Sequence, residues 1–272
     1  MTRGTYLDNI LHQRRERLAV EKARESLAEV RDLALAAVSG RPARPLGKIL
    51  GGGGPGIVKV IAEVKRASPS KGMLAPHLNP AQLAGDYVAA GAAAISVLTE
   101  PDFFLGSALD LVAVQRAVAV PVLRKDFLID PYQVYQSKVM GADAVLLIVA
   151  ALGEKTGEML DLVGELGMDA LVEVHTAAEM EMALAAGATI IGINNRNLRS
   201  FHVDLTVTEE VAGVAPAGSG VVLVSESGIK TRADVERVAA AGAGVVLVGE
   251  TLVTAKEPGA ALRELLGAAG GN

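Results

Sequence analysis

Short apolar segments recur along the chain and alternate with longer amphipathic ones. The short segments are rich in Val, Ile and Leu and are apolar at nearly every position, which is typical of parallel strands covered on both faces. They lie at residues 58–64, 94–98, 120–124, 144–149, 170–174, 190–193, 221–224 and 245–248. Between them, apolar residues three and four positions apart predict helices, for example at residues 81–90, 108–118, 131–140 and 233–241. The pattern therefore predicts a strand followed by a helix, repeated eight times.

Glycines mark the boundaries of this repeat. A Gly-Ala step precedes several predicted strands, at Gly91, Gly141, Gly187 and Gly242, and each glycine suits the left-handed residue that ends a helix. Eight strand–helix units in about 250 residues are typical of a TIM barrel. An open doubly wound sheet would instead need a Gly-x-Gly-x-x-Gly motif after an early strand, and no such motif follows one.

Residues 5–38 lie outside the repeat. Apolar positions among many Arg and Glu residues predict one or two amphipathic helices there, with the charges on a solvated face. A glycine-rich run at residues 51–56 predicts a linker, and it is no P-loop because no Gly-Lys-Ser follows it. The predicted fold class is α/β, a single (β/α)8 TIM barrel with an extra N-terminal helical segment. We expect residues 1–50 to pack on the barrel as helices and linker, and residues 51–272 to form the barrel, in one domain overall.

Composition excludes several classes of protein. The 272 residues include no cysteine, which excludes disulfides, thiolate metal sites and cysteine nucleophiles. The four histidines lack the spacing of zinc ligands, so we predict neither a metal nor a cofactor. A net charge of −5 and 3% aromatic residues argue against nucleic-acid binding. Because no apolar run suits a signal peptide or a membrane span, we expect a cytoplasmic protein without membrane contact, acting as a monomer.

The predicted strands end in residues that can carry chemistry. In a TIM barrel the C-terminal ends of the strands share one face, where active sites lie. Glu63 and Lys65 are two residues apart, so their side chains point to the same side of the first strand. The fourth strand ends apolar, at Leu146, Leu147 and Ile148. Other strand ends contribute Lys125, Glu173 and Asn194. This set predicts acid–base chemistry on a partly apolar substrate.

The last two strands suggest a bound anion. Gly228 precedes a helix predicted from about residue 231, and Gly249 precedes a short helix. Backbone amides at helix N-termini favour anions, and this is the usual phosphate position in such barrels. We therefore predict phosphate binding by the amides of Gly228, Gly249 and Glu250, with the Glu250 side chain pointing outward. The alternative is that these glycines only make tight turns.

Eight short motifs follow one another through the predicted barrel. They read IAEVKRASPSKG at 61–72, LTE at 98–100, FLGS at 104–107, LRKDF at 123–127, GADAVLLI at 141–148, LVEV at 171–174, IGINNRNL at 191–198 and SESGI at 225–229. Together they resemble the indole-3-glycerol phosphate synthase family of tryptophan biosynthesis, whose extra N-terminal segment the first helices match only in pattern. The resemblance implies a carboxy-lyase that closes 1-(2-carboxyphenylamino)-1-deoxyribulose 5-phosphate to indole-3-glycerol phosphate, releasing carbon dioxide and water. It implies a small sugar-phosphate substrate.

The resemblance also implies catalytic roles. Lys125 would protonate the ribulose carbonyl during ring closure, while Lys65 and Glu173 would act as acid and base in the later steps. Glu63 would pair with Lys65 and keep it charged and oriented. Asn194 would hydrogen-bond substrate hydroxyls or Glu173.

Substrate-binding roles follow from the same resemblance. Ser68 and Ser227 would position the carboxylate or the phosphate. An apolar wall would flank the anthranilate ring and keep the site dry, formed by Phe104, Phe127, Leu146 and Leu147. We expect His175 to be a loop residue. Three arginines should point away into ion pairs or assist the phosphate from outside, namely Arg66, Arg124 and Arg196.

Two other functions are consistent with parts of this pattern. A Schiff-base lyase could use Lys65 or Lys125 as nucleophile, but it needs a neutral lysine, and neighbouring carboxylates favour a charged one. A non-catalytic phosphate-binding barrel would have no use for acids and bases at so many strand ends. Each residue taken singly could be an ion pair, a cap or a turn former; their joint occurrence favours an active site.

Overall fold

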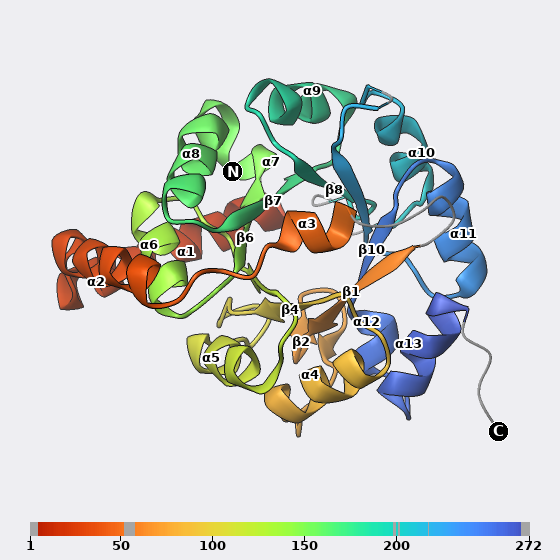
Figure 1. Cartoon of the computed structure of the whole chain (residues 1–272), viewed down its shortest axis with the longest axis horizontal. Helices are drawn as coiled ribbons and strands as arrows, with labels where there is room; N and C mark the ends of the chain where they lie inside the picture. The colour runs from red at the N-terminus through yellow and green to blue at the C-terminus, as the bar shows by residue number, and fades with distance from the viewer. Residues whose placement is uncertain (1–4, 52–57, 198–199, 201, 217, 268–272) are drawn as a thin grey trace.

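Eight parallel strands close into a barrel (Figure 1). The computed structural model describes residues 5–51, 58–197, 200, 202–216 and 218–267. The strands of the barrel are β1 (Lys59–Val64), β4 (Ala94–Leu98), β5 (Val122–Lys125), β6 (Ala144–Ile148), β7 (Asp169–Val174), β8 (Ile190–Asn194), β9 (Val222–Glu226) and β10 (Val245–Val248). They follow one another around the barrel in chain order, and β1 closes it by pairing with both β4 and β10. The predicted (β/α)8 TIM barrel is confirmed.

Each strand is followed by a helix that packs outside the barrel (Figure 1). These helices are α4 (Pro80–Ala89), α5 (Ala108–Ala117), α6 (Pro131–Val139), α8 (Thr156–Glu165), α9 (Ala177–Ala185), α10 (Thr206–Ala212), α11 (Arg232–Ala240) and α13 (Pro258–Leu266). Shorter turns precede two of them: α7 (Val149–Leu152) with a 3-10 turn η1 (Gly153–Lys155), and α12 (Glu250–Val253). Among the described residues, no helix is long and apolar enough to cross a membrane.

The pleat of the strands separates two apolar clusters. Along β1, Ile61 points into the barrel, whereas Val60 and Ala62 point outward to the helices. Leu46 and Leu50 join the inner cluster from α3 (Leu46–Gly51), so this short helix closes the N-terminal end of the barrel. Side chains that share the inward face are therefore apolar at that end, and the same face is free to carry polar groups at the other.

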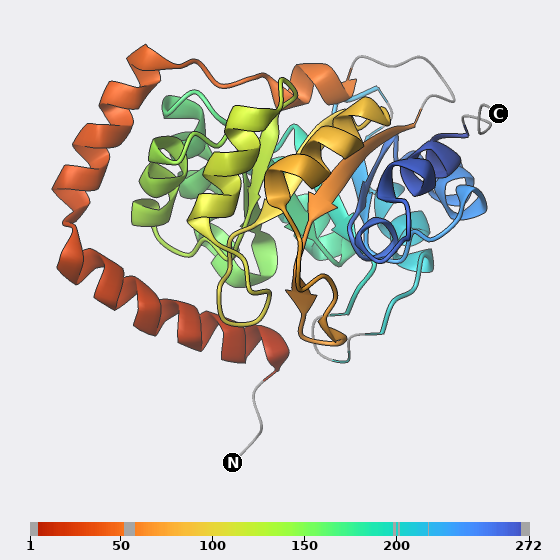
Figure 2. The ribbon, with the colours of Figure 1, turned by 90° about the horizontal axis from the view of Figure 1, so that it is seen from below.

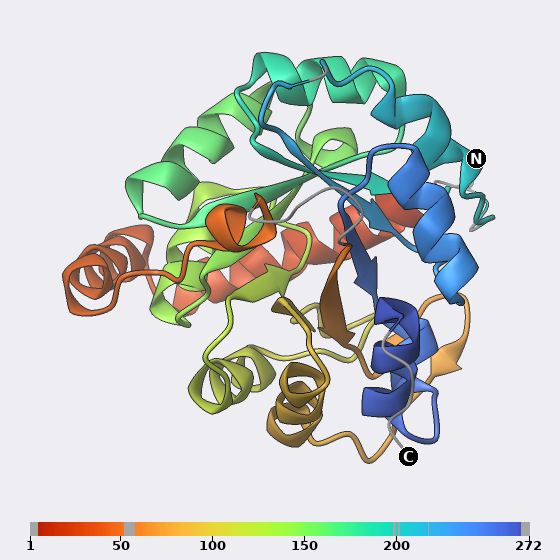
Figure 3. The same cartoon turned by 45° about the vertical axis from the view of Figure 1, so that its right-hand side comes forward.

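The N-terminal segment forms two helices, α1 (Tyr6–Arg24) and α2 (Leu27–Gly40), as its amphipathic pattern predicts. Figures 1 and 3 show α3 in front of the barrel and α1 behind it, and Figure 2 shows α1 beside the ends toward which the strands point. The expected solvated face of charges is wrong for Arg14. The Arg14 side chain is buried, because α1 points it toward the residue that follows β5. Its Nη1 lies 2.8 Å from Glu21 Oε1, and its Nε lies 3.8 Å from Asp126 Oδ1.

Several strands run further toward their polar ends than the apolar pattern predicts. β9 extends to Glu226, which is paired in register with Leu247 and Asn194 of its neighbours, because backbone pairing does not depend on an apolar side chain. The loop after β1 also contains an unpredicted pair of two-residue strands, β2 (Ala67–Ser68) and β3 (Gly72–Met73). The predicted linker at residues 51–56 lies, apart from Gly51, outside the described residues.

Candidate active site

A cavity of about 590 Å³ opens at the C-terminal ends of the strands. The predicted site residues that line it are Glu63, Lys65, Ser68, Phe104, Lys125, Phe127, Leu146, Glu173, Asn194, Ser227, Gly228, Gly249 and Glu250. The one predicted residue that does not line it is Leu147. Tyr6, Leu7 and Ile10 of α1 contribute to the wall, so the N-terminal helix covers part of the mouth. The cavity is thus lined by residues of the N-terminal helix α1 and by residues of the barrel.

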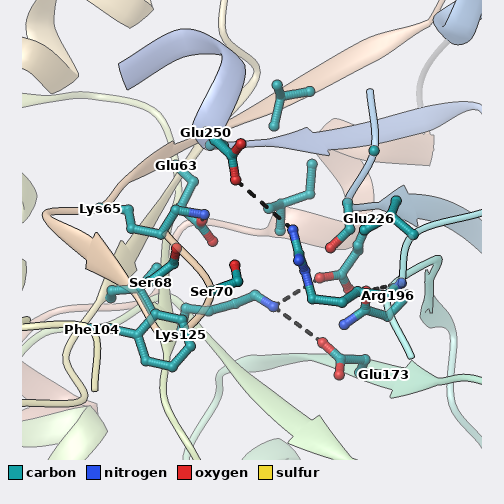
Figure 4. Close-up of a pocket in the computed structure, with 18 of the residues that line it drawn as sticks. Glu63, Lys65, Ser68, Ser70, Phe104, Lys125, Glu173, Arg196, Glu226 and Glu250 are labelled. Carbon is teal, nitrogen blue, oxygen red and sulfur yellow. Dashed lines mark hydrogen bonds and ion pairs between the residues drawn. The ribbon is translucent and has the colours of Figure 1, made fainter. Parts of the chain in front are cut away.

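Lys125 lies between two buried carboxylates (Figure 4). Its Nζ donates hydrogen bonds to Glu226 Oε2 at 2.8 Å and to Glu173 Oε2 at 3.1 Å. Burial by itself lowers the pKa of Lys125, but the negative charges of Glu226, Glu173 and Glu63 outweigh it, so the pKa is raised. The amine is therefore held as an ammonium, which is the state that a proton donor requires.

The two carboxylates around Lys125 are not equivalent. Burial favours the neutral form of both, but Lys125, His175 and a hydrogen bond from Asn194 hold the pKa of Glu173 below its ordinary value. For Glu226, burial and repulsion by Glu173 prevail over Lys125 and raise the pKa to about 7. Glu226 can therefore take up and release a proton near neutral pH, whereas Glu173 stays charged.

Glu226 has one oxygen prepared for a ligand. Its Oε1 is buried and has no hydrogen-bond partner in the described part of the chain. A side chain on Gly192 of β8 would collide with this oxygen, so the glycine provides the space that the carboxylate occupies. An unpartnered buried acceptor is costly to maintain, which is a reason to expect a substrate group beside it.

Glu63 and Lys65 form the opposite side of the site. Lys65 Nζ lies 2.9 Å from Glu63 Oε1, as the two-residue spacing predicts, and Ser96 Oγ donates a 3.5 Å hydrogen bond to Glu63 Oε2. A Cβ on Gly249 would collide with Glu63 Oε1. Gly249 therefore makes room for Glu63, besides any contact its amide makes with a substrate.

The apolar wall contains Ile148 in place of Leu147. Successive side chains along β6 point to opposite faces of the barrel wall. Leu146 and Ile148 therefore face the cavity, and Leu147 packs among the helices. Of the two consecutive residues predicted for the wall, Leu146 faces the cavity and Leu147 does not. Phe104 and Phe127 stand on the same wall with ring centroids 6.2 Å apart.

Buried polar residues hold the loops that carry these side chains. Glu100 accepts hydrogen bonds from the amides of residues 102–104 and thereby orders the turn that presents Phe104. Asn195 donates from Nδ2 to the carbonyl oxygens of Glu226 and Ser227 at 3.0 and 3.1 Å. Ser227, directly after β9, has a positive φ of 66°, which is uncommon for a residue with a side chain and is a kind of backbone strain that often occurs at functional sites.

The predicted phosphate end agrees with expectation at the start of helix α11 and differs from it at Glu250. Helix α11 begins at Arg232 with Thr231 as its N-cap, close to the predicted start, and Gly228 precedes it in a loop. The capping box of Thr231 and Asp234 already occupies amides of the first turn. The Glu250 side chain does not point outward. It lies over the cavity, 3.9 Å from Arg196 Nη2 and 3.6 Å from Lys71 Nζ (Figure 4 shows the Arg196 pair).

The remaining expectations concern the arginines and His175. Arg66 pairs with Asp110, and Arg124 is buried in an ion pair with Asp126, so both point away from the cavity as predicted. His175 follows the end of β7, also as predicted, but its Nε2 lies 3.6 Å from Glu173 Oε1.

Glu226 was not assigned to the site from the sequence, and Arg196 was expected to point away into ion pairs or to assist the phosphate only from outside. Arg196 lines the cavity beside Asn194, and Glu226 binds Lys125 directly. A signal for Glu226 exists, because it follows the inward-facing Val224 by two positions on the same strand. Arg196 lies in a loop, where no such periodicity applies.

Solved structures of other proteins share the fold of this chain, and two of them illustrate the likeness. 3-Hexulose-6-phosphate synthase superposes with a TM-score of 0.60 at 18% identity, covering 78% of this chain and 99% of that one. Thiamine phosphate pyrophosphorylase from Pyrococcus furiosus superposes with a TM-score of 0.58 at 14% identity, covering 77% and 93%. At such low identity these likenesses support the barrel and nothing about chemistry.

Sequence comparison is more specific. The family model described as indole-3-glycerol phosphate synthase matches residues 7–265. A protein of that name from Carboxydothermus hydrogenoformans is 48% identical over 263 residues, covering 96% of this chain and 99% of the relative. Another from Syntrophobacter fumaroxidans is 46% identical over 264 residues, covering 97% and 98%. Since the match spans the N-terminal helices, the barrel and the site together, the chain belongs to the indole-3-glycerol phosphate synthase family.

Proposed function

We propose that this chain, as a cytoplasmic monomer, converts 1-(2-carboxyphenylamino)-1-deoxyribulose 5-phosphate to indole-3-glycerol phosphate, carbon dioxide and water in tryptophan biosynthesis. The observation that carries the proposal is an ammonium held between two buried carboxylates, opposite a second lysine–glutamate pair. Such an arrangement supplies two acids and a base in one cavity. The apolar wall beside it suits an aromatic ring.

Ring closure requires a proton donor at the ribulose carbonyl. The aryl carbon that bears the carboxylate attacks the carbonyl carbon, and Lys125 gives a proton to the carbonyl oxygen, which becomes a hydroxyl. Because Glu173 and Glu226 accept two hydrogen bonds from Lys125, the ammonium is aimed before the substrate binds. Loss of carbon dioxide then leaves its bonding electrons to the ring and restores aromaticity.

Dehydration completes the pyrrole ring. Lys65 gives a proton to the departing hydroxyl, and a base removes a proton from the adjacent carbon, so that water leaves and a double bond forms. We assign Glu226 rather than Glu173 as this base, because a pKa of about 7 suits proton transfer at neutral pH. Glu226 can then return the proton to Lys125, whose Nζ is 2.8 Å away.

The remaining residues bind and orient the substrate. Asn194 and Glu173 form one hydrogen-bonding group near Lys125, suited to the sugar hydroxyls. Ser68 lines the same cavity as Lys65 and would position the carboxylate. The amides of Gly228 and Gly249, with Ser227, would hold the phosphate. The wall for the anthranilate ring is Phe104, Phe127, Leu146 and Ile148.

A Schiff-base mechanism is less consistent with this site. A lysine nucleophile must lose its proton, but the carboxylates around Lys125 raise its pKa instead. Borohydride trapping with the substrate tests this directly. We expect no covalent adduct on Lys125 or Lys65, and an adduct on either would contradict the acid role.

Product fluorescence tests the proposed function. The chain contains no tryptophan, so the protein contributes no indole emission of its own. We expect turnover of the carboxyphenylamino deoxyribulose phosphate in the presence of a chelator. Glu226→Gln, which removes the proposed base, should lower activity roughly a hundredfold, whereas the same substitution at the exposed Glu264 should not. Equal activity of these two variants would contradict the proposed mechanism.

A further inference from the structure

A negatively charged side chain lies at the phosphate end of the cavity. Glu250 lines the cavity together with Gly228 and Gly249, the residues expected to hold the phosphate. Its two carboxylate oxygens face different cations: Oε1 lies 3.6 Å from Lys71 Nζ, and Oε2 lies 3.9 Å from Arg196 Nη2. A carboxylate would repel a phosphate, so its presence here needs an explanation.

The three charged residues belong to three different strand ends. Lys71 is in the loop after β1, Arg196 follows β8, and Glu250 follows β10. Lys71 is largely exposed, with 61% of its side chain accessible, whereas 24% of Arg196 and 33% of Glu250 are accessible. Both distances exceed those of hydrogen bonds, so the carboxylate attracts the two cations without being locked to either.

We propose that Glu250 is an internal competitor of the substrate phosphate: it pairs with Lys71 and Arg196 in the empty site and is displaced from them when the phosphate binds. This inference rests on the proposed function. The carboxylate holds both cations near the phosphate position, which keeps the loops after β1 and β8 together. Binding must break these pairs, so Glu250 lowers the affinity for phosphorylated ligands and hastens their release.

The test measures binding of indole-3-glycerol phosphate and of the same indole glycerol without its phosphate, by indole fluorescence anisotropy. Glu250→Gln keeps the shape of the side chain and removes its charge. We expect this variant to bind the phosphorylated ligand about two- to fivefold more tightly, mostly through slower dissociation, since exposed ion pairs are of this strength. Affinity for the unphosphorylated ligand should not change. Glu264→Gln, on the outer helix α13, is the charge-matched control and should change neither.

A second variant tests whether the competition acts through the cations. Lys71→Met should weaken binding of the phosphorylated ligand, and in this background Glu250→Gln should give a smaller gain. Weaker binding in Glu250→Gln, or equal effects on both ligands, would overturn the inference while leaving the proposed function intact. A wild-type protein that neither makes nor binds indole-3-glycerol phosphate would overturn both.

Discussion

The two ends of the barrel both bury charged groups, but they satisfy them differently. At the N-terminal end, Asp143 is fully buried and accepts hydrogen bonds from the amides of Arg44 and Val122 at 2.8 and 2.9 Å. Two arginine side chains also pair with this carboxylate: Arg44 Nε lies 2.8 Å from Oδ2, and Arg41 Nη1 lies 3.1 Å from Oδ1. Every position around this carboxylate is occupied by the protein itself, so it fastens the segment before α3 to the barrel.

At the C-terminal end, a buried charged group lacks a full set of hydrogen-bond partners within the described part of the chain. Lys125 is shared by two carboxylates, and Glu226 Oε1 has no partner among the described residues. Burial raises the pKa of Glu226 to about 7, so its charge is easily changed. The comparison shows that burial alone does not identify a functional group. A buried charge with a full set of partners stabilises the fold, and one with an open position is available for chemistry.

The largest expected effect on activity comes from replacing Lys125, the cation that two carboxylates share. Lys125→Met should lower kcat/KM by roughly four orders of magnitude, since it removes the proton donor for ring closure. A thermal melt checks that the variant is folded. Activity within tenfold of the wild type would contradict the contrast, because Lys125 would then be a structural ion pair like those at Asp143.

Asp143→Asn tests the opposite end. Removing this charge leaves two arginines around a buried neutral group, and we expect the free energy of unfolding to fall by about 3 kcal/mol or more. Urea denaturation measures the loss. At a temperature where the variant is folded, kcat should stay within about twofold of wild type. A large fall in kcat without loss of stability would show that the two ends are not separate in function.

The pH dependence of stability and of activity tests whether Glu226 differs from Asp143 in being free to change its charge. The folded pKa of Glu226, about 7, lies above its ordinary value of 4.5. The proton-bound form is therefore favoured by folding: its contribution to stability is complete below about pH 4.5 and is lost as the pH rises through 7. Activity should behave oppositely, because a base must be ionised, so kcat/KM should rise with a midpoint near pH 7.

Measured pH profiles of activity then show whether Glu226 acts as the base or only occupies its place in the site. Glu226→Gln should lower kcat roughly a hundredfold and remove the limb near pH 7. A variant that loses activity but keeps this limb would show that another group titrates there. Glu264→Gln serves as the control, with the wild-type profile.

The smallest effect concerns the glycine behind Glu226. Gly192→Ala would place a methyl group against Glu226 Oε1 and displace the carboxylate from Lys125. We expect kcat to fall roughly tenfold, since small misplacements of a catalytic group are costly. The midpoint of the pH profile should also shift. Gly164→Ala is the matched control, because a methyl group there would meet no other atom within 4 Å.

Much of the fold followed from local patterns. Apolar runs and helical spacing identified the strands and helices of the barrel, since burial on both faces requires apolar residues throughout a parallel strand. Errors occurred where strands became polar. The pattern ended β9 before Glu226, and the apolar run of β6 did not reveal which of Leu146, Leu147 and Ile148 face the cavity.

The sequence by itself therefore determined the barrel, its helical extension, and the strand ends where acids and bases gather, because periodicity and order along the chain carry this information. Only the tertiary structure decided how the charges are shared. The placement of Glu226 beside Lys125 joins residues 101 positions apart, and the pairing of Glu250 with Lys71 and Arg196 joins three separate loops. The number of partners around each buried charge, which depends on such distant contacts, separates the charges that hold the fold from those that can act on a substrate.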